Sequence, residues 1–155
     1  IKDSGKNIIV KYIFNNKIRI ANIISIVDEF IEEKLSENDT LILILNTKSL
    51  NSDENLEKYF NTVYNTRNIF CQYFLIDKIT FNITEHVLVP KHEILTEDES
   101  KTLLTKYCVT NFSKFPVIYK TDPVAKYYGM KPGNVCKIIR SSESAGQFIN
   151  YRYCV

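Results

Sequence analysis

The sequence predicts a two-module α+β protein: a small α/β module with a mostly parallel sheet over residues 1–78, followed by a second module over residues 79–155. Strand-like and helix-like patterns alternate through the first module, whereas the interior glycines all lie in the second. The charge balance also changes, from 10 basic and 11 acidic residues in the first module to 10 and 7 in the second. The 155 residues are enough for two small domains, each with a modest core.

Five elements are predicted in the first module. The β-branched stretch 7–14 predicts a strand, and apolar residues at helical spacing predict a helix over 18–35. Residues 41–45 form a continuous apolar run, which is typical of a strand covered on both faces. Ser52 is predicted to cap a second helix, and a third strand follows at 69–76. The order βαβαβ predicts a parallel sheet with helices on its faces.

The second module is predicted to begin with an extended stretch over 81–90. Thr96 and Glu99 form a capping box, which predicts the start of a helix. A strand is expected at 115–119.

Start and stop signals define the rest of the second module. Asp122 is predicted to cap a short helix that has Pro123 at its first position and Gly129 at its end. Residues 131–134 predict a turn. The remaining chain, 135–154, predicts two strands joined by a short loop.

Several chemistries are excluded by the pattern. The first module has one glycine, Gly5, and it precedes the first strand, so the sequence contains no glycine-rich phosphate loop. A nuclease of this element order needs carboxylates and a lysine on adjacent strands. The strand 41–45 carries no ionisable residue, and Asp39 lies before it. No cofactor is expected.

A metal site is also not expected. The four cysteines are widely spaced and include no Cys-x-x-Cys pair: Cys71, Cys108, Cys136 and Cys154. His86 and His92 are six residues apart across Pro90, which is poor geometry for two ligands on one element. We expect these histidines to be hydrogen-bonded structural groups, and the cysteines to be buried, reduced thiols of a cytosolic or nuclear protein.

The net charge and the composition of the chain do not indicate a binding partner. The formal charge is +2, and no block of like charges suggests a nucleic-acid arm. The apolar runs are too short for a membrane helix, so no membrane partner is expected. Ile, Asn and Lys make up 52 of the 155 residues, which indicates an A/T-rich genome such as that of a parasite, a fungus or a large DNA virus.

Charged residues on the two terminal strands leave two interpretations open. Lys137, Arg140 and Arg152 lie on these strands, and Glu143 lies in the loop between them. They form either a solvated sheet face with cross-strand charge pairs or a docking surface. The second interpretation follows because strands at a chain terminus offer an edge to another protein.

Several motifs of the second module occur in one register with those of a known family. They are residues 86–92 (HVLVPKH), 122–129 (DPVAKYYG), Gly133, 137–140 (KIIR), 142–146 (SESAG) and Tyr151-Arg152. The sequence from about residue 79 to 155 resembles the fifth-largest, common subunit of the eukaryotic nuclear RNA polymerases, a family that also has an archaeal counterpart.

This resemblance implies a role for each module. Residues 79–155 would be the assembly domain, a compact mixed-sheet unit that packs on the largest polymerase subunit and contacts other subunits. Residues 1–78 would be the jaw domain, which borders downstream DNA in the lower jaw. The family's jaw usually begins with a further helical segment, which this chain is expected to lack. Nucleotide addition and its magnesium would belong to the two largest subunits, so this chain would be non-catalytic.

The physical properties of the matched residues suggest their roles, since charged groups on a strand pair are not required for its core. The expected contacts to the largest subunit are Lys137, Arg140, Glu143 and Arg152. The residues expected to shape the fold are His86, Pro90, His92, Asp122, Pro123, Gly129, Gly133 and Gly146. The loop after the buried strand lacks the proline that is common in the family, and its expected phosphate contacts, one or two in number, come from Lys48, Ser49 and Ser52.

Two other functions remain open. The runner-up is a free-standing adaptor or transcription-factor-binding module that reuses the second domain, and a nuclease is a distant third. No homo-oligomer is expected. Localisation depends on the source: the nucleus for a cellular protein, or a cytoplasmic factory or the virion for a large DNA virus. The sequence does not specify the polymerase class.

Overall fold

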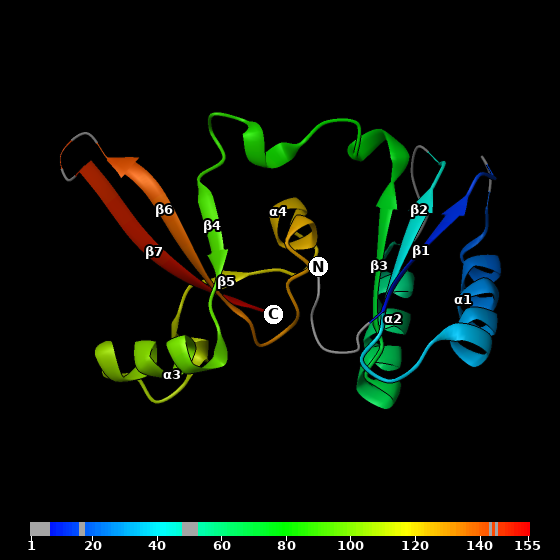
Figure 1. Cartoon of the computed structure of the whole chain (residues 1–155), viewed down its shortest axis with the longest axis horizontal. Helices are drawn as coiled ribbons and strands as arrows, with labels where there is room; N and C mark the ends of the chain where they lie inside the picture. The colour runs from blue at the N-terminus through cyan, green and yellow to red at the C-terminus, as the bar shows by residue number, and fades with distance from the viewer. Residues whose placement is uncertain (1–6, 16–17, 48–52, 143, 145) are drawn as a thin grey trace. The chain divides into compact units, whose positions relative to one another are not determined.

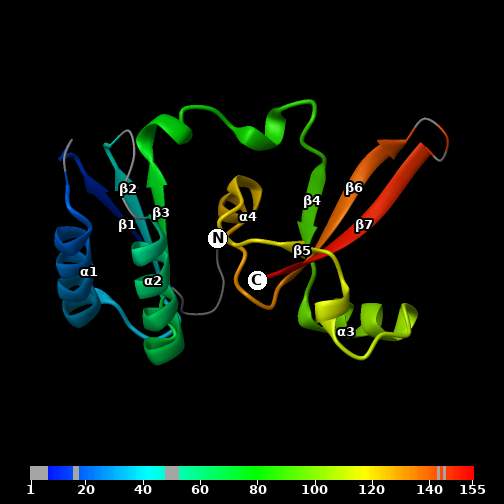
Figure 2. The same cartoon turned by 180° about the vertical axis from the view of Figure 1, so that it is seen from behind.

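The computed structural model describes residues 7–15, 18–47, 53–142, 144 and 146–155. The chain divides into two compact units, Ile1–Phe81 and Asn82–Val155. Each unit has its own sheet, as Figures 1 and 2 show from opposite sides. None of the helices in the described part is long and apolar enough to cross a membrane.

The N-terminal unit has the predicted order of strands and helices. Its elements are β1 (Ile8–Ile13), α1 (Ile20–Lys34), β2 (Thr40–Leu45), α2 (Asp53–Arg67), β3 (Phe70–Leu75) and the short 3-10 helix η1 (Ile76–Lys78). The strands lie in the order β1-β2-β3, and both pairings are parallel. The predicted βαβαβ arrangement is therefore confirmed.

The core of this unit lies on one face of the sheet. Alternate residues of β2, namely Leu41, Leu43 and Leu45, are buried together with residues of both helices. The helical members are Ile23, Val27 and Ile31 of α1 and Leu56, Phe60 and Val63 of α2. Both helices share this face because two successive right-handed crossovers, made in the same direction along the sheet, place them on the same side.

The expectation that β2 is covered on both faces is wrong, and so is the placement of helices on both faces. Ile42 and Ile44, which point away from the core, are only half-buried. On β1, Val10 and Tyr12 are aligned with them and are exposed. The continuous apolar run of β2 predicted that both of its faces are covered. A central strand can be apolar for another reason, because its neighbouring strands, here β1 and β3, also shield its side chains from water.

Asp39 is a buried carboxylate that ties the start of β1 to the segment before β2. It is 1% exposed. Its two oxygens accept hydrogen bonds from the backbone N–H groups of Asn7 (2.8 Å) and Ser36 (2.9 Å). The hydrogen bonds from Ser36 and Asn7 hold the pKa of Asp39 below its ordinary value, because they stabilise the ionised form. Asp39 thus has a structural role in joining these two segments.

The C-terminal unit contains a mixed four-stranded sheet. Its elements are the 3-10 helices η2 (Ile83–Glu85) and η3 (Phe112–Lys114), the strands β4 (Lys91–Ile94), β5 (Val117–Ile118), β6 (Val135–Ser142) and β7 (Gly146–Cys154), and the helices α3 (Glu97–Lys106) and α4 (Pro123–Tyr127). The strand order is β4-β6-β7-β5. The β5–β7 pairing is parallel and the other two pairings are antiparallel, so the predicted mixed sheet is confirmed.

One local prediction in this unit is wrong, and another is confirmed only in part. The stretch 81–90 is not extended, because Asn82 caps η2 by accepting a hydrogen bond from the Thr84 N–H (3.0 Å), and such a local bond competes with extended backbone. The strand expected at 115–119 is reduced to β5. In addition, β4 was not predicted, since its four residues are too few to show a clear alternation.

Helix α4 begins and ends where the sequence predicts. Asp122 accepts a hydrogen bond from the Val124 N–H (2.8 Å), and proline occupies the first helical position. At the other end, Gly129 adopts φ +62° and donates to the Lys126 carbonyl, while Met130 donates to the Ala125 carbonyl. This is a Schellman motif. It places Met130 in a small core with five other buried residues: Ile118, Ala125, Cys136, Ile138 and Cys154.

Candidate docking surface

The β6–β7 hairpin presents two faces with different chemistry. Residues opposite one another in an antiparallel pair share a face. The arginine face, as we call it, has Arg140, Phe148, Asn150 and Arg152, and it continues into the core through Cys136 and Ile138. The lysine face has Lys137, Ile139, Ile149 and Tyr151. The structure therefore separates the predicted contact residues: two arginines lie on one face and Lys137 on the other. Glu143 lies outside the described residues.

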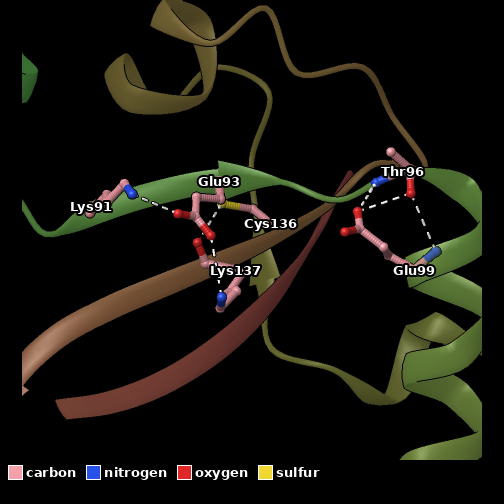
Figure 3. A network of polar contacts seen from close by, with 6 residues as sticks. All are labelled: Lys91, Glu93, Thr96, Glu99, Cys136 and Lys137. Atoms are coloured by element: carbon pink, nitrogen blue, oxygen red, sulfur yellow. Dashed lines mark hydrogen bonds and ion pairs between the residues drawn. The ribbon is translucent and has the colours of Figure 1, made fainter.

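A charged network occupies the β4 side of the lysine face (Figure 3). Glu93 lies opposite Lys137 in the register of β4 and β6, and it accepts a hydrogen bond from the Lys137 Nζ (3.3 Å). Lys91 forms a shorter ion pair with the same carboxylate (2.7 Å). Lys91 and Lys137 together hold the pKa of Glu93 below its ordinary value, and Glu93 raises the pKa of Lys91. Because water screens these groups, the network adds little stability, but it does engage Lys137 within the chain.

The same figure shows how α3 is anchored after β4. The Thr96 hydroxyl accepts a hydrogen bond from the Glu99 N–H (3.4 Å), and the Glu99 carboxylate accepts one from the Thr96 N–H (2.8 Å). The predicted capping box is confirmed. The bond from the Thr96 backbone is the main reason that the pKa of Glu99 lies below its ordinary value.

Aromatic rings cover the lysine face at Tyr151 and Tyr153. Tyr107, at the end of α3, packs edge-on against Tyr151 (5.9 Å between ring centroids) and Phe115 (5.8 Å). Phe112 of η3 stacks on Tyr153 (5.7 Å). This face is therefore partly closed by the chain itself at residues 151–153, whereas Ile149 remains 43% exposed. Sequence patterns do not predict this cluster, because its members come from three separate elements.

The two arginines of the arginine face have no partner among the described residues. Within the described part of the chain, no ion pair or hydrogen bond joins Arg140 or the guanidinium of Arg152 to another residue. The Nε atom of Arg152 is buried and has no hydrogen-bond partner. A buried N–H without an acceptor is costly and calls for an explanation. Phe148, opposite Arg140, is 55% exposed, so this face offers both charge and apolar surface.

The two predicted histidines are held by local hydrogen bonds. His92 is buried, and its Nδ1 donates to the Pro90 carbonyl (2.7 Å), because a carbonyl can only accept. Its ring lies beside Tyr128 (6.3 Å between centroids). His86 is exposed, and its Nδ1 accepts from the Leu88 N–H (3.2 Å). Between the two histidines, the side chain of Val87 is 92% exposed, which the sequence analysis did not predict.

The remaining predicted residues fall into two groups. Gly133 and Gly146 both adopt positive φ (+97° and +69°). Gly133 lies in the turn before β6, and Gly146 opens β7. The predicted DNA contacts, Lys48, Ser49 and Ser52, lie outside the described residues.

The cysteines are all free thiols. Cys71, Cys136 and Cys154 are buried, and burial raises the pKa of Cys71 to about 12 and that of Cys136 to about 11. Cys108 is exposed after α3, so the expectation of a buried thiol is wrong there. Among the residues that the structure describes, no group of His, Cys, Asp and Glu side chains could hold a metal ion.

Fold and surface together define an α+β protein with a parallel-sheet domain and a mixed-sheet domain that carries an arginine-bearing hairpin. Residues 81–154 match the family described as RNA polymerase Rpb5, C-terminal domain. The C-terminal unit of this chain is similar to that family over these residues, and the predicted resemblance to the common polymerase subunit is confirmed over this part of the chain.

Curated relatives carry matching names. A Dictyostelium discoideum protein, "DNA-directed RNA polymerases I, II, and III subunit rpabc1", is 51% identical over 78 residues, which are 50% of this chain and 39% of the relative. A Caenorhabditis elegans protein, "DNA-directed RNA polymerases I, II, and III subunit RPABC1", is 46% identical over 84 residues, 54% of this chain and 39% of the relative. The match thus spans about two fifths of each relative.

Proposed function

We propose that this protein is a non-catalytic subunit of a multisubunit DNA-directed RNA polymerase. The observation that carries the proposal is the family match of residues 81–154, together with the names of relatives that are 46–51% identical. In this role the C-terminal unit docks on the largest subunit, and the two largest subunits perform nucleotide addition. The protein would act in the nucleus, as the names of its relatives suggest for a cellular source.

Docking is assigned to the arginine face. Arg140 and Arg152 have no carboxylate partner among the described residues, whereas Lys137 is engaged by Glu93. A partner that presents carboxylates would form charge-assisted hydrogen bonds with both guanidinium groups. Phe148 would add apolar contact at the same place. Arginine beside an aromatic side chain is a common composition at the centre of protein interfaces.

The N-terminal unit is proposed to border downstream DNA. Its element order, with three parallel strands and two helices, is similar to that of the family's jaw domain. Its charge balance of 10 basic and 11 acidic residues supports only a few phosphate contacts, so DNA affinity would come mainly from the rest of the polymerase.

The proposal is tested by purifying the tagged full chain from its native source and identifying the bound proteins by mass spectrometry. The wild-type chain should recover the large polymerase subunits at equal stoichiometry. The double variant Arg140→Glu/Arg152→Glu should lose them, because it places carboxylates where the partner has its own. A matched variant, Lys91→Glu/Lys137→Glu, changes the net charge equally on the other face and should keep them. Circular dichroism and thermal unfolding check that each variant is folded.

Two results would contradict the proposal at different levels. If the arginine variant retained the largest subunit, docking would not use the arginine face. If the wild-type chain itself recovered no large polymerase subunits, the polymerase assignment would fail, and a free-standing adaptor that reuses this domain would become the better description.

A further inference from the structure

The outer edge of β7 is open over most of its length. In the sheet order β4-β6-β7-β5, the strand beyond β7 is β5, which pairs with β7 only at Tyr153 and Cys154. Within the described residues, no strand pairs with this edge between Gly146 and Arg152. β7 therefore presents a run of backbone hydrogen-bonding groups that lacks a neighbouring strand.

The register identifies the backbone groups at this edge. Tyr153 and Val155 donate their N–H groups outward, to the carbonyls of Pro116 (2.8 Å) and Ile118 (3.0 Å). Because the direction alternates along a strand, the N–H and C=O groups of Gln147, Ile149 and Tyr151 also point outward. The Tyr151 N–H is occupied by the Asn150 side chain, whose Oδ1 accepts it at 2.8 Å.

The hairpin also projects beyond the rest of its sheet. β4 pairs with β6 only as far as Ile139, so the part formed by residues 140–142 and 146–148 is a two-stranded ribbon, seen in Figures 1 and 2 as the free ends of β6 and β7. A two-stranded ribbon is marginally stable alone, and a third strand would stabilise it. The edge residues Gln147, Ile149 and Tyr151 include no lysine and no proline, which are residues that usually protect a free edge from pairing.

Side chains beside the edge define the chemistry of a strand that could pair there. On the arginine face, the strand would pass Phe148 and Arg152, with Arg140 behind them on β6. On the lysine face, it would pass Ile149 and Tyr151. The described residues of β6 and β7 include three basic side chains and no acidic one. Charge complementarity therefore favours a strand with carboxylates toward the arginines and apolar side chains toward Ile149.

We propose that β7 accepts an added β-strand from another polymerase subunit, an extended segment in which acidic and apolar residues alternate. The inference rests on the proposed function, since it names how that docking is made. Main-chain hydrogen bonds to Gln147, Ile149 and Tyr151 would hold the donor strand, and the two arginines would select its acidic side chains. The Asn150 side chain would release the Tyr151 N–H when the donor strand arrives.

Substitution at Ile149 separates backbone pairing from side-chain contact. Ile149→Pro removes an outward N–H, but it removes no hydrogen bond to β6, since that N–H points away from β6. Ile149→Ala keeps the N–H and shortens the side chain. With full-length tagged chain, Ile149→Pro should reduce recovery of the large polymerase subunits at least tenfold, and Ile149→Ala should reduce it much less. Equal recovery with both variants would overturn the inference.

Amide hydrogen exchange tests the same idea without a variant. In the chain alone, the Gln147 and Ile149 amides should exchange quickly, while the Phe148 amide, which faces β6, is protected. In the polymerase that co-purifies with the tagged chain, exchange at Gln147 and Ile149 should slow at least tenfold. If the polymerase is recovered but these two amides still exchange quickly, strand addition is wrong while the proposed function stands. If no polymerase is recovered, the proposed function itself fails.

Discussion

The two units are stabilised in different ways. In the N-terminal unit, two helices of 15 residues each pack on one face of a parallel sheet, and 14 buried residues form the described core. In the C-terminal unit, the corresponding core has six residues around a five-residue helix. The C-terminal unit compensates with local devices, namely a capping box and a Schellman motif. A small core therefore makes the fold depend more on turns and helix caps, and these are visible in the sequence as motifs.

Their uncovered surfaces differ as well. On the face of the N-terminal sheet that lies away from the helices, Ile8, Val10 and Tyr12 are exposed along β1. The open hairpin of the C-terminal unit combines arginine with Phe148 and Ile149. Apolar surface alone says little about what it contacts, whereas arginines form their strongest hydrogen bonds with groups of opposite charge. For this reason, of these two surfaces, only the C-terminal one indicates the chemistry of its partner.

The largest expected effect comes from matched core truncations. Leu43 and Ile138 are each 1% exposed, one in each core. Changing either to alanine should cost about 2–5 kcal/mol. Because Ile138 is one of only six core residues, Ile138→Ala should unfold the C-terminal unit, while Leu43→Ala should leave the N-terminal unit folded but less stable. Amide hydrogen exchange measures whether each unit is folded in each variant. Unfolding of the N-terminal unit by Leu43→Ala, with the C-terminal unit still folded in Ile138→Ala, would contradict this prediction.

A smaller effect is expected at the end of α4. Gly129 adopts φ +62°, and a Cβ there would meet no atom within 4 Å, so Gly129→Ala tests backbone strain alone. The left-handed conformation should cost about 1–2 kcal/mol for alanine. Gly129→Asn should cost less, since asparagine tolerates this conformation better. Thermal unfolding of the full chain compares the two. Equal stability of Gly129→Ala and wild type would show that the Schellman motif contributes little to the C-terminal unit.

The two units also differ in which of their features the sequence could predict. The strands and helices of the N-terminal unit were predictable because apolar spacing identifies each element. The sequence could not predict which face of this sheet is covered. Ile42 and Ile44 are apolar, but that does not show that both helices lie on the other side. In the C-terminal unit, the caps at Thr96 and Asp122 were predictable from local motifs.

For the candidate docking surface, the sequence could predict which residues belong to it but not how they are arranged. The sequence shows that Lys137, Arg140 and Arg152 lie on paired strands. The face that each side chain occupies depends on register, and the partner of Lys137 depends on β4, a strand too short to be detected from periodicity. The unpaired Nε of Arg152 depends on tertiary packing. Sequence patterns therefore identify candidate residues, and register separates them.

Acidic pH should weaken the N-terminal unit through Asp39. Hydrogen bonds from Ser36 and Asn7 lower the folded-state pKa of Asp39 below its ordinary 3.8. The stabilisation is therefore complete above about pH 4 and is lost as the pH falls through the folded-state pKa. Asp39→Asn should lower the melting temperature at pH 7, and the difference from wild type should shrink as the pH approaches 2. Glu37→Gln, at an exposed position nearby, is the control. A difference that does not change with pH would show that the charge of Asp39 is unimportant.

The smallest expected effect concerns DNA. If the N-terminal unit borders downstream DNA through Lys48, replacing Lys48 with alanine removes one phosphate contact. The slope of log Kobs against log salt should then decrease in magnitude by about 1, with a uniform loss of affinity across DNA sequences. The measurement uses the assembled polymerase and a downstream duplex, with Lys48→Arg as the control that keeps the charge. Ser49→Ala and Ser52→Ala should leave the slope unchanged, because a hydroxyl releases no counterion. An unchanged slope for Lys48→Ala would show that Lys48 contacts no phosphate of the downstream DNA.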